Sequence, residues 1–65
     1  MKQRLEEIYR LEDVVEIYLR TVFGEDWYPG KVVRMDYPGL WVETQEGGQW
    51  FVTNRARIRK AGPDG

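Results

Sequence analysis

The side chains of this chain that could carry chemistry are cations, amides and aromatic rings rather than nucleophiles. The 65 residues contain no His, Cys or Ser. Serine, cysteine and histidine nucleophiles and a His general base are therefore excluded, as are disulfides and thiolate metal sites. An enzyme would depend on carboxylates alone, and a chain this short has little room for a cleft of ~300–1,000 Å³. We therefore expect a non-catalytic protein with no cofactor and no bound metal.

Basic side chains gather near the C-terminal end. Residues 1–26 carry four basic against seven acidic residues, whereas residues 47–62 contain no acid. The cations of this second segment are Arg55, Arg57, Arg59 and Lys60. Arg55, Arg57 and Arg59 would share one face of a strand because their spacing is two. Such a stripe either contacts phosphate groups or protects an exposed sheet edge from aggregation.

Aromatic residues are dense, with three Trp, four Tyr and two Phe. Exposed rings stack nucleobases at ~1–3 kcal/mol per base or form a cage for a methylated lysine, and otherwise they fill cores and interfaces. Trp41 lies between Leu40 and Val42 in an alternating run, so we expect it to face away from the core. We predict that Trp41 and Trp50 are stacking or interface residues. Tyr37 lies in a turn signal and is the best candidate for a solvent-facing stacking residue.

These side chains must be positioned by a helix and several short strands. Residues 1–23 contain no Gly or Pro, and all seven Gly and three Pro follow. Strong helix formers predict an N-terminal helix over residues 1–13. Residues 14–22 fit two patterns, a helical spacing that would extend this helix and an alternation of β-branched residues typical of a strand. We favour the strand and keep one long helix as the alternative.

The remaining chain predicts strands separated by turns. We expect strands over residues 27–35, 40–45, 49–53 and 56–59, with turns at residues 23–26, 36–39 and 47–48. Gly30 predicts a strong bend or bulge in its strand, and Asp36 is expected to cap its turn. The fold class is mainly β: an N-terminal helix and a five-stranded, strongly bent antiparallel SH3-like small barrel over residues 14–60. Residues 61–65 are expected to form a flexible tail.

Three segments resemble the first Sm motif. They are the V-x-I-x-L run Val15–Leu19, the segment Gly30–Asp36 with its G-x-V…D pattern, and the apolar run Gly39–Glu43. Over residues 4–60 the chain is similar to Sm-like bacterial proteins of the Hfq type, in their divergent cyanobacterial form. The resemblance implies a single Sm-type barrel domain that assembles into a homo-oligomeric ring, a hexamer or heptamer, and binds single-stranded RNA. Thr53-Asn54-Arg55 stands here where that family has the Tyr-Lys-His segment of its uridine-binding pore.

RNA binding is accordingly predicted at Tyr37, Asn54, Arg55 and Arg57. Acidic residues within the segment 5–16 predict that RNA approaches from the opposite face. In the ring, the strand near Trp50–Thr53 would pair with residues 56–59 of a neighbouring copy. Two alternatives remain open: a Tudor- or SH3-like module that binds a protein segment, and an Sm-like ring whose role is purely protein–protein. No apolar run approaches ~18 residues and no signal peptide is visible, so we expect a soluble, cytoplasmic protein with no membrane partner.

Overall fold

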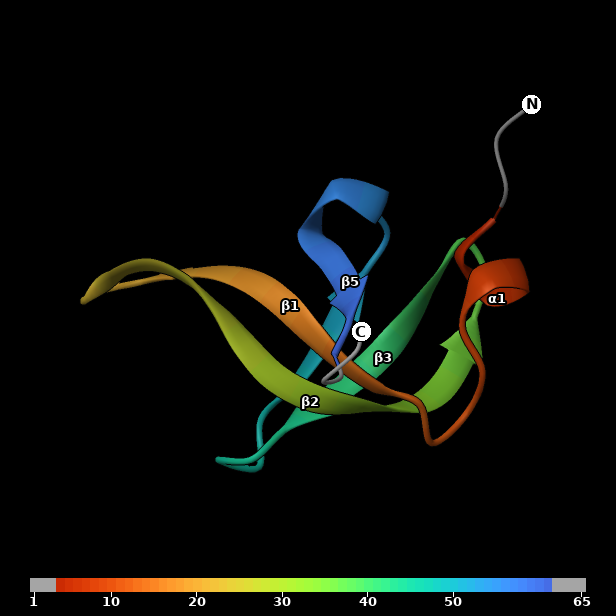
Figure 1. The fold of residues 1–65 in the computed structure, drawn as a ribbon, viewed down its shortest axis with the longest axis horizontal. Coiled ribbons are helices and arrows are strands. Elements are labelled where there is room, and N and C mark those ends of the chain that lie inside the picture. The colour runs from red at the N-terminus through yellow and green to blue at the C-terminus, as the bar shows by residue number, and fades with distance from the viewer. Residues whose placement is uncertain (1–3, 62–65) are drawn as a thin grey trace.

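Five strands form one antiparallel sheet in a computed structural model that describes residues 4–61 (Figure 1). In chain order the elements are α1 Leu5–Ile8, β1 Val14–Thr21, β2 Gly24–Asp36, β3 Gly39–Thr44, β4 Gln49–Val52, the 3-10 helix η1 Arg55–Arg57 and β5 Ile58–Lys60. The order across the sheet is β4-β3-β2-β1-β5. Among the described residues, β4 and β5 are therefore edge strands that do not pair with each other, and the sheet is not closed.

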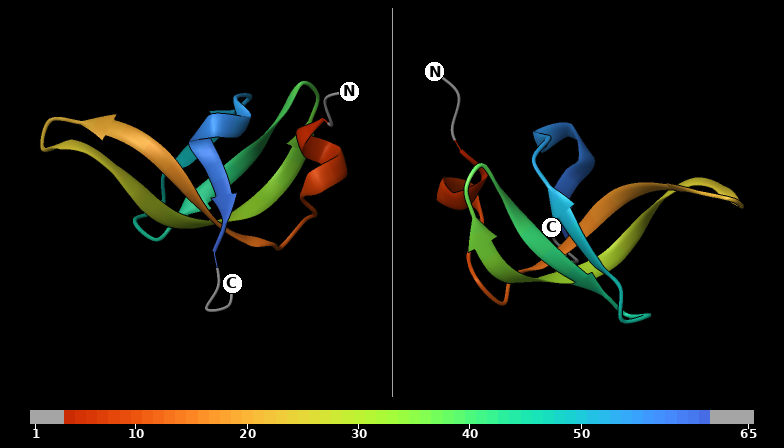
Figure 2. Two further views of the ribbon diagram at one scale, coloured as in Figure 1. Left: turned by 45° about the horizontal axis from the view of Figure 1, so that its top comes forward. Right: turned by 180° about the vertical axis from the view of Figure 1, so that it is seen from behind.

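The strand β2 connects the two halves of the sheet and bends strongly between them (Figure 2). Its first part pairs with β1 and its second part pairs with β3, and Gly30 belongs to both ladders through Val15 and Thr44. A Cβ atom at Gly30 would lie 2.6 Å from Val42 Cγ1 and 2.8 Å from the Glu43 carbonyl oxygen. The predicted special role of Gly30 thus corresponds to a close approach of two strands. The irregularity in the ladder itself lies between Val32 and Arg34.

The core consists of alternate residues from the strands, closed at one end by the N-terminal segment. Val15 and Ile17 are fully buried whereas Val14 is 59% exposed, which is the alternation of a half-buried strand. The predicted strand at residues 14–22 is therefore confirmed, and the alternative of one long helix is wrong. The other buried hydrophobic residues are Leu5, Tyr9, Val32, Leu40, Val42, Val52 and Ile58.

The N-terminal helix was predicted over residues 1–13 but ends at Ile8, because tertiary contacts replace its later hydrogen bonds. Residues 1–3 of that prediction lie outside the described residues. Tyr9 is already extended, and its hydroxyl donates to the Ile58 carbonyl oxygen at 3.4 Å. The Glu12 N–H donates to the Val32 carbonyl at 2.8 Å, and the Val32 N–H donates to the Asp13 carbonyl at 3.0 Å. Residues 12 and 13 are thus held by β2, and Glu12 adopts a positive φ of 76°.

The segment after β4 also differs from the prediction. Residues 55–57 form η1 rather than a strand, since the Asn54 side chain accepts the Ala56 N–H at 2.9 Å and caps this turn. The expectation that Arg55, Arg57 and Arg59 share one strand face is therefore wrong.

The turns between the strands lie close to their predicted places. Tyr37-Pro38 connects β2 to β3 as predicted. The β3–β4 turn lies at Gly47-Gly48 as predicted, and of these two residues Gly47 has a positive φ, of 93°. The predicted turn at residues 23–26 is shorter, because β2 begins at Gly24.

The described part of the chain is thus mainly β with one short helix, consistent with a small β-barrel-like fold. No helix among the described residues is long and apolar enough to cross a membrane. The expected tail lies outside the described residues except for Ala61.

Candidate binding groove

Three of the four residues predicted to bind RNA line one open groove. It lies between the start of α1 and the β2–β3 turn on one side and the β4–η1 connection on the other, with a volume of about 840 Å³. Its lining residues are Arg4, Leu5, Tyr37, Pro38, Thr53, Asn54, Arg55 and Ala56. No acidic side chain belongs to this lining. In Figure 1 these segments are the red α1, the green turn beside it and the blue η1.

Tyr37 is held in the groove by an arginine that sequence reasoning missed. The Arg4 guanidinium lies 4.9 Å from the centre of the Tyr37 ring, within the range of a cation–π contact. The ring nevertheless remains 64% exposed. Arg4 also lies 3.8 Å from the Glu6 carboxylate, and Glu7 accepts the Arg4 backbone N–H at 3.2 Å. The charge of Arg4 is therefore partly offset by the helix that follows it.

Arg55 is the cation that the groove can offer to a ligand. Arg55 is exposed, and it forms no ion pair with any other residue in the range 4–61. The neighbouring Asn54 uses its side-chain oxygen to cap η1. This hydrogen bond fixes the orientation of the amide, and the NH₂ group of the same side chain can donate to a ligand in the groove. The groove thus combines an exposed ring, an oriented amide donor and an available guanidinium.

Arg57 lies elsewhere, on the outer face of β1 and β2. Its guanidinium is 6.0 Å from the Tyr18 ring centre, and the next arginine along, Arg59, is 4.0 Å from the Trp27 ring centre. Tyr18 and Trp27 themselves meet edge to face at 5.4 Å. Arg59 is also paired with Glu16 at 2.7 Å. Arg57 therefore belongs to an outer cluster of arginines and aromatic rings, and the structure does not bring it to the groove.

The two tryptophans singled out in the sequence have different surroundings. Trp41 faces away from the core as predicted, packs on Phe51 at 5.1 Å between ring centres, and donates its indole N–H to Asp36 at 3.3 Å. Asp36 also lies 3.6 Å from Arg34. The Asp36 carboxylate therefore contacts these two side chains and not the turn backbone that it was expected to cap. Trp50 is 44% exposed and lines a separate apolar hollow.

The acidic segment near the N-terminus is not one helical flank. Glu12 pairs with Lys31 at 3.6 Å and Glu16 pairs with Arg59, both outside α1. The groove also lies directly against Arg4 and Leu5. RNA bound at Tyr37, Asn54 and Arg55 would therefore lie beside residues 4 and 5. This site is incompatible with the separate expectation that RNA approaches from the face opposite residues 5–16.

Tyr9 is a buried residue that the sequence did not single out. It is 6% exposed, and burial raises the pKa of its phenol while the positive charge of Arg55 partly opposes the rise. On the outer face, the hydrogen bond to Glu25 is the main cause that raises the pKa of Tyr18. The spacing of Tyr9 four residues after Leu5 was the available signal, because both would lie on the same side of a helical turn.

The described residues contain no group of three or more acidic side chains placed to hold a metal ion. Comparison of the chain with protein-family models, with curated proteins and with solved structures found no match. The groove's own geometry therefore carries the functional argument.

Proposed function

We propose that this protein is a non-catalytic, Sm-like RNA-binding protein of the Hfq type that assembles into a homo-oligomeric ring and binds single-stranded RNA in the groove. The observation that carries the proposal is the meeting of Tyr37, Asn54 and Arg55, from two separate connections, in one acid-free groove. Single-stranded RNA is recognised by stacking of bases, by hydrogen bonds to base edges and by cations near phosphates. The groove holds one group suited to each of these tasks.

Assembly is supported by the two edge strands. A chain of 65 residues without disulfides buries little apolar surface by itself, and β4 and β5 each leave backbone groups unpaired within the described residues. Antiparallel pairing of β4 of one copy with β5 of the next would cover both edges at every interface. Repetition around a ring of six or seven copies would also repeat the groove, so that one RNA strand could contact several subunits.

RNA binding is tested by two arginine substitutions that remove the same charge. We expect Arg55→Ala to weaken binding of a single-stranded RNA and to reduce the salt slope by about one unit, because one phosphate contact is lost. Arg57→Ala is the matched control, since Arg57 lies outside the groove. Tyr37→Ala should cost ~1–3 kcal/mol if a base stacks on the ring. Binding is measured by fluorescence anisotropy at two salt concentrations.

Equal losses for Arg55→Ala and Arg57→Ala would contradict the groove as the site. Absence of wild-type RNA binding at low salt would instead favour one of two protein-binding functions. The mass in solution separates these two, because six copies of a 7.7 kDa chain give a particle of about 46 kDa, whereas a Tudor- or SH3-like module stays near the monomer mass. The observation that favours a protein-binding role is the exposed apolar pair Val22 and Phe23 in the β1–β2 turn, at 93% and 94% exposure.

A further inference from the structure

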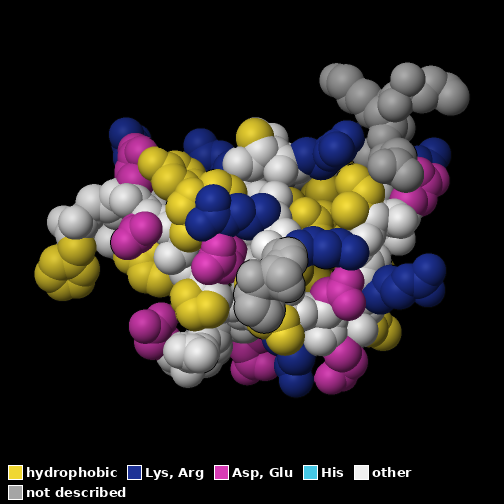
Figure 3. Space-filling view, viewed as in Figure 1, with side chains coloured by type: hydrophobic (Ala, Val, Ile, Leu, Met, Phe, Trp, Pro, Cys, Tyr) yellow, Lys and Arg dark blue, Asp and Glu magenta, His cyan; other side chains and the backbone are white. Residues whose placement is uncertain are grey.

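The tip of the β1–β2 hairpin is an apolar projection. This hairpin extends well beyond the other strands, and its tip forms the left-hand end of the molecule in Figure 1. Val22 and Phe23 at the tip are 93% and 94% exposed. The same end appears as protruding hydrophobic surface in Figure 3. Single exposed apolar residues are ordinary, but two adjacent ones on a projection indicate an interaction site.

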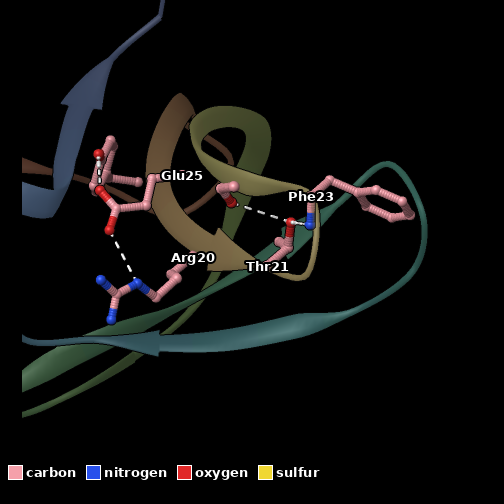
Figure 4. A network of polar contacts seen from close by, with 6 residues as sticks. Arg20, Thr21, Phe23 and Glu25 are labelled. Carbon is pink, nitrogen blue, oxygen red and sulfur yellow. Dashed lines mark hydrogen bonds and ion pairs between the residues drawn. The ribbon is translucent and has the colours of Figure 1, made fainter.

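The tip has a fixed shape. The Thr21 hydroxyl accepts the Phe23 N–H at 3.1 Å and donates to the Gly24 carbonyl at 3.2 Å. Behind it, Arg20 pairs with Glu25 across the hairpin at 2.9 Å. Figure 4 shows this network, with the Phe23 ring directed away from it. A preordered tip loses little conformational entropy when it binds.

An apolar hollow of about 410 Å³ begins at the tip and runs along the inner side of the hairpin toward β4. Its lining residues are Leu19, Thr21, Phe23, Tyr28, Thr44, Glu46, Gly48 and Trp50. An apolar cavity of ~150 Å³ is enough to hold benzene, so the hollow has room for a phenyl side chain. Trp50, at 44% exposure, offers a ring surface for such a side chain to contact.

We propose that the tip of one copy enters the hollow of a second copy, and that the second tip enters the first hollow in return. Phe23 belongs both to the projection and to the lining of the hollow. Projection and hollow are therefore parts of one surface patch, and a self-complementary patch of this kind forms a two-fold contact. The inference is independent of the proposed RNA site, because the hollow and the groove share no lining residue.

Charge around the patch favours a protein over a phosphate-bearing surface. Arg20 is already paired with Glu25, and Asp26 and Glu46 add two further acids beside the hairpin and the hollow. An anionic bilayer or a nucleic acid would be repelled by this excess of negative charge. A second copy carries the same acids, but unlike a phosphate surface it also offers an apolar centre, and the acids of both copies can stay solvated at the rim.

The contact is small. A fully exposed aromatic side chain buries ~150–250 Å², and Trp50 is only 44% exposed, so the Phe23 and Trp50 rings of two copies would bury roughly 600 Å² in total. This area lies below the ~1,200 Å² of stable interfaces. We therefore expect a weak, concentration-dependent association that adds to any assembly through the sheet edges.

The absence of cysteine allows a direct test. A nitroxide is attached to a Val22→Cys variant, which keeps Phe23, and this protein is mixed with ¹⁵N-labelled wild type. In the mixture, the indole N–H signal of Trp50 should lose clearly more intensity than that of Trp41, which faces the other side of the sheet. Introducing Phe23→Ser into both proteins should abolish this difference. Leu11→Ser is the matched control, since Leu11 is 55% exposed and lies outside the hairpin and the hollow.

Either of two results would overturn the proposal: no broadening between copies at high protein concentration, or a Trp50 effect that persists unchanged with Phe23→Ser. Phosphatidylcholine vesicles provide a further arm. Loss of the tip signals on addition of vesicles, without broadening between copies, would assign the tip to a bilayer and reject the second copy as its occupant. RNA affinity measured on the Phe23→Ser variant keeps a failure here distinct from a failure of the proposed RNA site.

Discussion

Gly30 lies where two strands approach so closely that there is no room for a side chain. It pairs with Val15 on one side and Thr44 on the other, and any Cβ atom would collide with Val42 and the Glu43 carbonyl. We expect Gly30→Val to lower the free energy of unfolding by at least ~1–3 kcal/mol, the cost of overpacking. Urea denaturation measures this change.

The matched control is Lys31→Val, which introduces the same side chain at the next position. Lys31 is exposed and its ion pair with Glu12 is at the surface, so its loss should change stability by less than ~1 kcal/mol. Equal stability of the two variants would mean that the strands at Gly30 are not packed as closely as described.

Tyr9 makes stability depend on pH in the alkaline range. Burial raises the pKa of its phenol above the ordinary value of 10.0, so the folded state holds the proton more tightly than the unfolded chain. The stabilisation is complete below the unfolded pKa and is lost as pH rises through the folded pKa. We expect the free energy of unfolding to fall above about pH 10 in wild type. The fall should be smaller in Tyr9→Phe, as measured by urea denaturation at a series of pH values.

A steeper alkaline loss in Tyr9→Phe than in wild type would contradict this role of Tyr9. Tyr9→Phe also removes the hydrogen bond to the Ile58 carbonyl. That loss should lower stability by ~1 kcal/mol at neutral pH, and it does not depend on the titration of the phenol.

The helix α1 depends on tertiary contacts for its stability. Four residues cannot form a stable helix alone, and Leu5, which is 3% exposed, attaches α1 to the core. We expect Leu5→Ala to cost ~2–5 kcal/mol. Leu11→Ala is the control, because Leu11 is 55% exposed and should change stability by less than ~0.5 kcal/mol. A similar small effect at both positions, by urea denaturation, would show that α1 is not anchored through Leu5.

Most strands could be predicted because their signals are local. Alternation at Val15 and Ile17 and the turn at Tyr37-Pro38 depend on residues close together in the chain. The early end of the helix could not be predicted, because it depends on contacts with Val32, about twenty residues away. The Val32 carbonyl accepts the Glu12 N–H, and the Val32 N–H donates to the Asp13 carbonyl. The reason for η1 is local instead: the strand spacing of Arg55 and Arg57 was outweighed by the cap that Asn54 provides to the Ala56 N–H two residues on.

The candidate site was predictable in part for similar reasons. Tyr37 and Asn54 lie in connections whose turn signals are visible in the sequence, and the strand order brings these connections together. Arg4 could not be placed there, since its position depends on where α1 packs. Arg57 was assigned to the site by its spacing from Arg55, and that spacing lost its meaning once the segment formed a 3-10 turn.

At the scale of the whole molecule, the proposed ring depends on what covers the outer strands. On β4, Phe51 packs on Trp41 at the outer face, and on β5 the exposed residues Arg59 and Lys60 are both basic. If β5 of a neighbour pairs with β4, a charge placed at Phe51 lies beside Arg59, which is on the outer face of its own copy. Lys60, the next residue of the strand, points to the opposite face. Phe51→Lys and Phe51→Glu lose the same contact with Trp41 but introduce opposite charges, so each serves as the control for the other.

We expect Phe51→Lys to weaken assembly more than Phe51→Glu. A like-charged cross-strand neighbour differs from an oppositely charged one by roughly 1 kcal/mol, which corresponds to about a fivefold difference in dissociation constant per interface. Sedimentation velocity over a concentration series measures the assembled fraction, and added salt should reduce the difference because exposed charges are screened. Wild type that stays monomeric at micromolar concentration, or a Glu variant weakened as much as the Lys variant at low salt, would contradict pairing of β4 with a neighbour's β5. Because both variants keep the backbone of β4, retention of the native β-sheet circular dichroism in each would locate any difference in the interface between copies and not in the fold of one.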